Sequence, residues 1–149
     1  MPQGRCNCSG IKVSIPEMPK QSAICYCANC RRQGATAGSI VYMLDKSEVT
    51  IDDPKSLLKT YKDSDTTSGN TIVRQFCSNC GSPVASILSE DSPKIILKGG
   101  IFDHLPKPAF SSFPQNKPEW LEIANLNKIE YGDVPARTVN TRCVKSKGE

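Results

Sequence analysis

Seven of the eight cysteines in this chain stand in three short groups whose spacing suits metal binding. Side chains two residues apart on a strand share one face, so a CxC pair can bind one ion. A tight turn brings the two sulfurs of a CxxC pair together in the same way. The groups comprise Cys6 and Cys8, then Cys25, Cys27 and Cys30, then Cys77 and Cys80. Metal coordination is therefore the chemistry that the residue types predict first.

A disulfide framework is the other common use of many cysteines. The first nine residues contain no apolar run of the signal-peptide kind, and no stretch approaches the roughly 20 apolar residues that cross a bilayer. We therefore expect a cytoplasmic protein, with the nucleus as the second compartment, and neither secretion nor membrane insertion. Thiols stay reduced there, and sulfurs this close in sequence are poor structural disulfide partners, so metal is the preferred interpretation.

A closed tetrahedral zinc site needs four ligands, and the clusters divide naturally into four and three. Cys77 and Cys80 flank a turn followed by Gly81, where a positive φ lets backbone N–H groups approach the thiolates. With the CxC pair at 6–8 this turn predicts a structural Cys₄ zinc site. The three cysteines at 25–30 predict a second Zn²⁺ with an open position, where a substrate can bind.

A different partition joins the two CxxC pairs, Cys27 with Cys30 and Cys77 with Cys80, into one ribbon-like site. Nothing would then be catalytic. The 46 residues between Cys30 and Cys77 exceed the roughly 15–20 of common zinc ribbons. This partition also leaves the remaining three cysteines of the clusters without a metal, so the division into four and three is favoured.

The formal charge of +4 counts every cysteine as neutral. Zinc-bound thiols are deprotonated, so seven thiolates and two Zn²⁺ lower the charge to about +1. The chain also lacks a long basic arm, since only the mild tail from Lys128 to Lys147 is basic. We therefore do not expect nucleic acid or a membrane as a partner.

The segments that must position the cysteines are short runs of β-branched and apolar residues between turn formers. These runs predict a mainly β fold of antiparallel sheets with little helix. They are Ile11 to Ile15, Ile40 to Leu44, Leu57 to Tyr61, Ile72 to Phe76, Val84 to Leu88 and Ile95 to Leu97.

Between the runs, one short helix is expected from Ala28 to Gly34, where the glycine can take the left-handed closing conformation. The polar run at 63–70 predicts an exposed turn between two strands. Four prolines between residues 99 and 118 predict an irregular segment. The length suits one domain, which we place at 1–137, followed by a polar, poorly ordered tail at 138–149 in which Cys143 is a free thiol.

The cysteine motifs as they stand resemble those of the glutathione-dependent formaldehyde-activating (GFA) family, which includes centromere protein V. The matching segments are GRCNC at 4–8, CYCANCRR at 25–32 with Gly34, and FCSNCGSP at 76–83, followed by Gly99, Gly100, Asp103 and Trp120. The resemblance covers roughly residues 4–124. It departs at Tyr26, and at Ala109 and Phe110, where many relatives carry His.

The resemblance implies the zinc-containing β-tent fold of that family, with the Cys₄ site structural and Cys25, Cys27 and Cys30 at the reaction centre. It implies a carbon–sulfur lyase that resembles S-(hydroxymethyl)glutathione synthase and uses glutathione or another small thiol. Three thiolates leave zinc a weak Lewis acid, which suits binding of a thiol better than activation of water. The centromere relative suggests the alternative, a non-catalytic zinc module for chromatin or the cytoskeleton.

Arg31 and Arg32 directly follow the third cysteine of the middle cluster. Their guanidinium groups can offset thiolate charge or bind substrate carboxylates, so both are predicted substrate-binding residues, although solvated arginines on a short helix are the simpler interpretation. His104, the only histidine, more simply faces solvent than completes the second site. Tyr42 and Trp120 either border the pocket or pack in the core.

Overall fold

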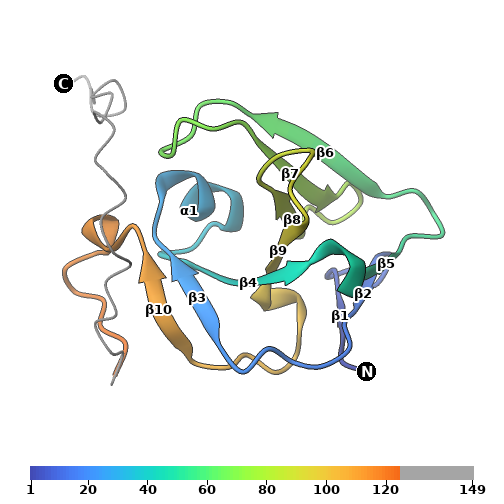
Figure 1. The fold of residues 1–149 in the computed structure, drawn as a ribbon, viewed down its shortest axis with the longest axis horizontal. Helices are drawn as coiled ribbons and strands as arrows, with labels where there is room; N and C mark the ends of the chain where they lie inside the picture. Colours follow the sequence, from blue (N-terminus) through green and yellow to red (C-terminus); the bar gives the residue numbers. More distant parts are fainter. Residues whose placement is uncertain (125–149) are drawn as a thin grey trace.

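The computed structural model describes residues 1–124, which form two β-sheets and one α-helix, α1 (Ala28–Gly34). Short 3-10 turns occupy Lys46–Glu48, Gly99–Ile101 and Pro114–Asn116. The arrangement is drawn in Figure 1. The strands are β1 (Gln3–Arg5), β2 (Lys12–Ser14), β3 (Ser22–Cys25), β4 (Ser39–Asp45), β5 (Thr50–Asp52), β6 (Leu58–Asp63), β7 (Ile72–Cys77), β8 (Pro83–Ile87), β9 (Lys94–Lys98) and β10 (Pro108–Ser112). The prediction of a mainly β fold with little helix is confirmed.

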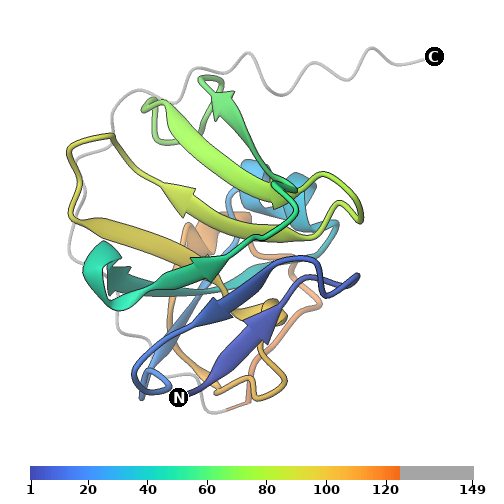
Figure 2. The same cartoon turned by 90° about the vertical axis from the view of Figure 1, so that its right-hand side faces the viewer.

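The larger sheet has seven strands in the order β10-β3-β4-β9-β8-β7-β6, and the smaller sheet has the order β1-β2-β5. Every pairing is antiparallel except that of β10 with β3, which is parallel. In Figure 2, the β6–β7 hairpin is drawn in green at the top and β1 and β2 in dark blue at the bottom. The beginning of the chain thus packs against the strands in the middle of the larger sheet, β4, β9 and β8.

The main core lies between the smaller sheet and one face of the larger sheet. Because side chains alternate along a strand, β4 sends Tyr42 into this core and leaves its neighbour Met43 60% exposed on the other face. On β9, Leu97 is buried in the same core. The rings of Tyr42 and Phe102 meet edge to face, with centroids 6.0 Å apart. The opposite face of the larger sheet is left to form the wall of a cavity.

All six predicted strands are present, although their ends differ by one or two residues. Four strands were not predicted, namely β1, β3, β5 and β10, because their short segments carry Gln, Arg, Ser or Asp and show no apolar run. The prediction of an irregular segment at 99–118 is wrong for β10. Pro108 is tolerated there because it is the first residue of an edge strand, where a missing N–H costs little.

The predicted helix is confirmed, but its ending differs from the expectation. Gly34 remains helical, and Ala35 takes the left-handed conformation with φ of 48°. Two bonds require this, because the N–H of Ala35 donates to Arg32 O at 3.4 Å and the N–H of Thr36 donates to Arg31 O at 3.1 Å. Among residues 1–124, no helix is long and apolar enough to cross a membrane.

The polar run at 63–70 is a turn between β6 and β7, as predicted, but it is not wholly exposed. Asp63 is the last residue of β6 and is buried. The predictions for the tail at 138–149 and for Cys143 lie outside the described residues.

Candidate metal centre

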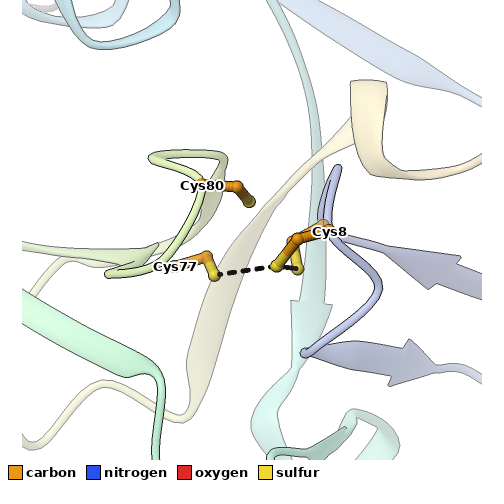
Figure 3. A group of neighbouring side chains, drawn as sticks. Cys8, Cys77 and Cys80 are labelled. Atoms are coloured by element: carbon orange, nitrogen blue, oxygen red, sulfur yellow. Dashed lines mark hydrogen bonds between the residues drawn. The ribbon is translucent and has the colours of Figure 1, made fainter.

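Four cysteines converge where the loop after β1 meets the turn after β7. Figure 3 shows Cys8 facing Cys77 and Cys80, with their sulfurs directed toward one another. The Sγ atoms of Cys8 and Cys77 are 3.7 Å apart, and those of Cys6 and Cys8 are 3.5 Å apart. Sulfurs bound at about 2.3 Å to one tetrahedral ion lie about 3.8 Å apart, so this cluster has the size that a metal ion requires.

The turn that carries Cys77 and Cys80 is shaped by Gly81, whose φ of +76° confirms the conformation expected from the sequence. The N–H of Gly81 donates to Cys77 O at 2.8 Å and closes the turn. Backbone donors also reach the sulfurs, since the N–H of Ile11 lies 3.3 Å from Cys6 Sγ. Such donors stabilise thiolates, and hence a bound cation.

Three of these thiols have shifted pKa values with separate causes, and a hydrogen bond with Asn79 lowers the pKa of Cys8. A hydrogen bond with Ser82, whose Oγ lies 3.3 Å from the sulfur, lowers the pKa of Cys80 to about 5. Burial raises the pKa of Cys77 to about 11, because the charged form loses its hydration. Cys80 therefore forms its thiolate more readily than Cys77 does.

The second cluster comprises Cys25, Cys27 and Cys30, whose sulfurs lie within 4.8 Å of one another. Cys25 ends β3, Cys27 caps α1 and Cys30 lies in the first turn of the helix. The N–H of Cys30 donates to Cys27 Sγ at 3.3 Å, so the helix cap and the cluster are built by the same residues. The cysteines group as four and three, and the ribbon-like partition is not observed.

All three cysteines of the second cluster are buried, and Phe113 packs against them. Among residues 1–124, no further Cys, His, Asp or Glu joins them within the same distance. Hydrogen bonds with Cys25 and Cys27 lower the pKa of Cys30 to about 2, and the same crowding raises the pKa of Cys25. Three buried sulfurs with no cation between them repel as thiolates, so this donor set fits a metal ion with one position left open.

A buried cation lies beside this cluster. Lys98 is 4% exposed, and its Nζ lies 3.9 Å from Cys30 Sγ. Burial lowers the pKa of Lys98, whereas the neighbouring thiolates oppose that change. An ammonium group in this position offsets negative charge on the sulfurs.

A second buried charge, Arg74, is paired with Asp63 through an Nε to Oδ2 distance of 2.7 Å. Asn29, which stands between the second and third cysteines of the cluster, donates from Nδ2 to Asp63 Oδ2 at 3.1 Å and to Asp65 O at 2.8 Å. The N–H of Thr67 donates to Asn29 Oδ1 at 3.2 Å. These bonds attach the turn between β6 and β7 to helix α1.

The three-cysteine cluster opens into a cavity of about 480 Å³ on the free face of the larger sheet. Its walls come from β3, β4, β7, β8, β9, β10, α1 and the turn at 66–68. In Figure 1, α1 lies between β3 and the β6–β7 hairpin, and it forms one side of this space. The cysteines therefore lie in the wall of a pocket large enough for an organic ligand.

The other predicted residues lie elsewhere. Arg31 and Arg32 are exposed on α1 and are absent from the described residues that line the cavity. His104 and Trp120 are exposed, and Tyr42 packs in the main core.

Four residues near the second cluster were not predicted as site residues from the sequence, namely Lys98, Arg74, Asp63 and Asn29. A signal existed for two of them, because period-2 alternation places Lys98 on the same face as Ile96, and Arg74 on the same face as Ile72. A charge on the inward face of a strand is rare without a partner. The roles of Asp63 and Asn29 depend on contacts across the fold and left no such signal.

The chain is similar in sequence to one known family and in fold to a solved structure. The profile of the family described as glutathione-dependent formaldehyde-activating enzyme matches residues 1–116. The fold is similar to that in a crystal structure of a Rhodobacter sphaeroides protein, with a TM-score of 0.56 and 16% sequence identity, over 74% of this chain and 99% of that chain. No curated protein sequence gives a significant match.

Proposed function

Because the chain belongs to the glutathione-dependent formaldehyde-activating enzyme family, we propose that it is a zinc-dependent enzyme of the carbon–sulfur lyase type. Its substrate would be the adduct of a small thiol such as glutathione, and its reaction would resemble that of S-(hydroxymethyl)glutathione synthase. The observation that carries this proposal is the convergence of three buried cysteines, without a fourth Cys, His, Asp or Glu among residues 1–124, in the wall of a cavity.

Zinc is the proposed metal in both clusters because all-thiolate tetrahedral sets are typical of it. Cys6, Cys8, Cys77 and Cys80 would close a structural site, and Cys25, Cys27 and Cys30 would hold the second ion. When bound there, zinc supplies a Lewis-acid centre that lowers the pKa of a thiol and favours its thiolate.

The net reaction joins a thiol to formaldehyde. The sulfur forms a bond to the carbonyl carbon, the π electron pair of the C=O bond moves to oxygen, and that oxygen receives the proton that the thiol gives up. The reverse reaction breaks the carbon–sulfur bond and returns both reactants. No oxidant or reductant is needed.

Two side chains beside the second cluster would contribute to this reaction, one through its positive charge and one through its packing. Three thiolates and Zn²⁺ sum to −1, so a fourth thiolate raises the negative charge to −2. The ammonium group of Lys98, buried 3.9 Å from Cys30 Sγ, offsets one of these charges where solvent does not screen it. Phe113 packs against the three cysteines and covers part of their surface.

The decisive experiment measures metal content and thiol binding together. The wild-type chain should hold two zinc ions, and cobalt replacement should give a spectrum that glutathione changes. Cys27→Ser should lose one ion and the glutathione response, while the four-cysteine site keeps its metal. A cobalt spectrum that no thiol changes would contradict the enzyme. The non-catalytic module for a macromolecular partner would then be preferred, and DNA binding at low salt would test it.

Two further predictions accompany this proposal. Arg31 and Arg32 remain proposed substrate-binding residues, and they would act from outside the cavity wall. The double substitution of Arg31→Ala and Arg32→Ala should weaken glutathione binding without loss of metal.

We also propose the cytoplasm as the location, with the nucleus as the alternative. Microscopy of the tagged protein in cells tests this.

A further inference from the structure

The cavity beside the three cysteines has a wall made largely of hydrocarbon. Its sheet face carries Val41, Met43, Ile72, Leu88 and Ile96. Met43 is 60% exposed and Leu88 is 39% exposed, which places them among the few large apolar side chains that residues 1–124 leave open to solvent. Apolar side chains gathered in an open hollow mark a ligand-binding surface, because covering them with a ligand removes their contact with water.

The charged side chains in the described wall already have partners. Arg74 and Lys98 are the charged residues among those that line the cavity. The guanidinium of Arg74 pairs with Asp63 at 2.7 Å, and the ammonium of Lys98 lies against Cys30 at 3.9 Å. Glutathione carries two carboxylates and an ammonium group, and the part of the wall that residues 1–124 form offers them no unpaired Arg, Lys, Asp or Glu side chain. The charged groups of glutathione therefore do not match the apolar side chains of this wall.

The apolar surface begins beside the cysteines and continues away from them. Ala23 stands two residues before Cys25 on β3 and pairs with Val41 on β4. Met43 stands two residues further along β4 and pairs with Ile96. Each such step is about 7 Å along a strand, so the wall from Cys25 to Met43 is roughly 14 Å long. Formaldehyde adds a single carbon and cannot occupy this length.

We propose that the substrate adduct carries an apolar substituent close to its sulfur, and that this substituent lies along Val41 and Met43. The inference rests on the proposed function and names its substrate class. The reaction remains the addition of a thiol S–H across a C=O bond, which gives RS–CH(OH)R′, with the thiol proton delivered to oxygen. The apolar group is R of the thiol or R′ of the aldehyde, since both place hydrocarbon beside the same sulfur.

The test uses the full chain with cobalt in place of zinc and follows thiol binding by the cobalt spectrum. In the first arm, alkanethiols from ethanethiol to pentanethiol should bind about fourfold more tightly for each added methylene. In the second arm, glutathione is equilibrated with formaldehyde, butanal or pentanal, and the apparent affinity should rise with aldehyde length. A gain in the first arm alone assigns the apolar group to the thiol, and a gain in the second alone assigns it to the aldehyde.

Two variants test whether the dependence of thiol affinity on chain length arises in the cavity. Met43→Glu puts a charge on an exposed part of the wall, so it should weaken pentanethiol binding at least tenfold and change ethanethiol binding less than twofold. Tyr61→Glu is the control, because Tyr61 is 59% exposed on β6 and does not line the cavity. Glutathione binding with no gain from chain length in either arm would overturn this inference and leave the proposed function intact. A spectrum that no thiol changes, glutathione included, would overturn both.

Discussion

Asn29 and Asp63, which are 34 positions apart in the chain, are joined by a hydrogen bond of 3.1 Å from Asn29 Nδ2 to Asp63 Oδ2. Asn29 lies between two cysteines of the open cluster, and Asp63 ends the strand before the turn at 64–71. The same amide also bonds Asp65 O and the N–H of Thr67. The side chain of Asn29 thus links helix α1 to the turn at 66–68, which forms one wall of the cavity.

Asn29→Ala should therefore lower the free energy of unfolding by about 1–3 kcal/mol, because Asp63 and two backbone groups lose partners. Urea denaturation monitored by circular dichroism measures this. Asn70→Ala, in the exposed part of the same turn, is the control and should change the stability by less than about 0.5 kcal/mol. Equal effects of the two substitutions would contradict the role assigned to Asn29.

Arg74→Met should cost about 3–5 kcal/mol of unfolding free energy, because it leaves the buried carboxylate of Asp63 without its cation. Lys94→Met is the matched control, since Lys94 pairs with Asp45 at 3.0 Å but both side chains are more than 40% exposed. Exposed pairs contribute about 0–1 kcal/mol. Guanidinium chloride unfolding of the two variants compares the pairs directly, and similar losses would rule out a special role for the buried pair.

Lys98→Met should keep both metal ions and weaken the binding of glutathione by tenfold or more, because an anionic sulfur loses the neighbouring ammonium group. Titration of the cobalt protein with glutathione measures the affinity, and metal analysis checks the content. Lys94→Met, on the exposed part of the same strand, should leave the affinity unchanged. Loss of the second metal in Lys98→Met would instead assign the lysine to metal retention.

The pH dependence of the four-cysteine site should respond to Ser82→Ala. The hydrogen bond with Ser82 lowers the pKa of Cys80 from 9.0 to about 5, so the stabilisation that this thiolate gives is present above pH 9 and is lost as the pH falls through about 5. Without the hydroxyl the pKa of Cys80 rises, so protons should displace the metal at a higher pH. A chromophoric chelator followed from pH 8 to pH 4 gives the midpoint, which should move upward. An unchanged midpoint would show that Ser82 does not tune this ligand.

Removal of the metals should unfold the smaller sheet first. Cys6 and Cys77 are 1% and 0% exposed and belong to the same core cluster as Ile11 and Val13, so a metal ion at these sulfurs would join β1 and β2 to the larger sheet. A strong chelator should lower the melting temperature of the wild-type protein by 10 °C or more. Cys27→Ser without chelator should melt within a few degrees of the wild type, because its four-cysteine site is intact. A larger decrease in the melting temperature of Cys27→Ser than in that of the chelated wild type would assign the structural role to the three-cysteine cluster instead.

The two cysteine clusters and the strands that bear large apolar residues could be predicted from the sequence alone. CxC and CxxC spacing predicts chelation because it brings two sulfurs together whatever the rest of the fold does. The run from Ile72 to Phe76 predicts a strand because its first residues are β-branched, and β7 extends it by one residue to Cys77. The helix at Ala28–Gly34 was also predictable, although its left-handed end falls at Ala35 because of two backbone bonds.

The polar residues that meet the cysteines could be identified only in the folded chain. Lys98 reaches Cys30 across 68 positions because β9 lies two strands from β3 in the larger sheet, and Asp63 reaches Asn29 because a hairpin turn folds over α1. Long-range contacts of this kind depend on strand order, which local propensity does not encode. The short strand β10 is likewise held by its parallel pairing with β3 and not by its own sequence, so it and the cavity wall beside it were visible only once the sheet was assembled.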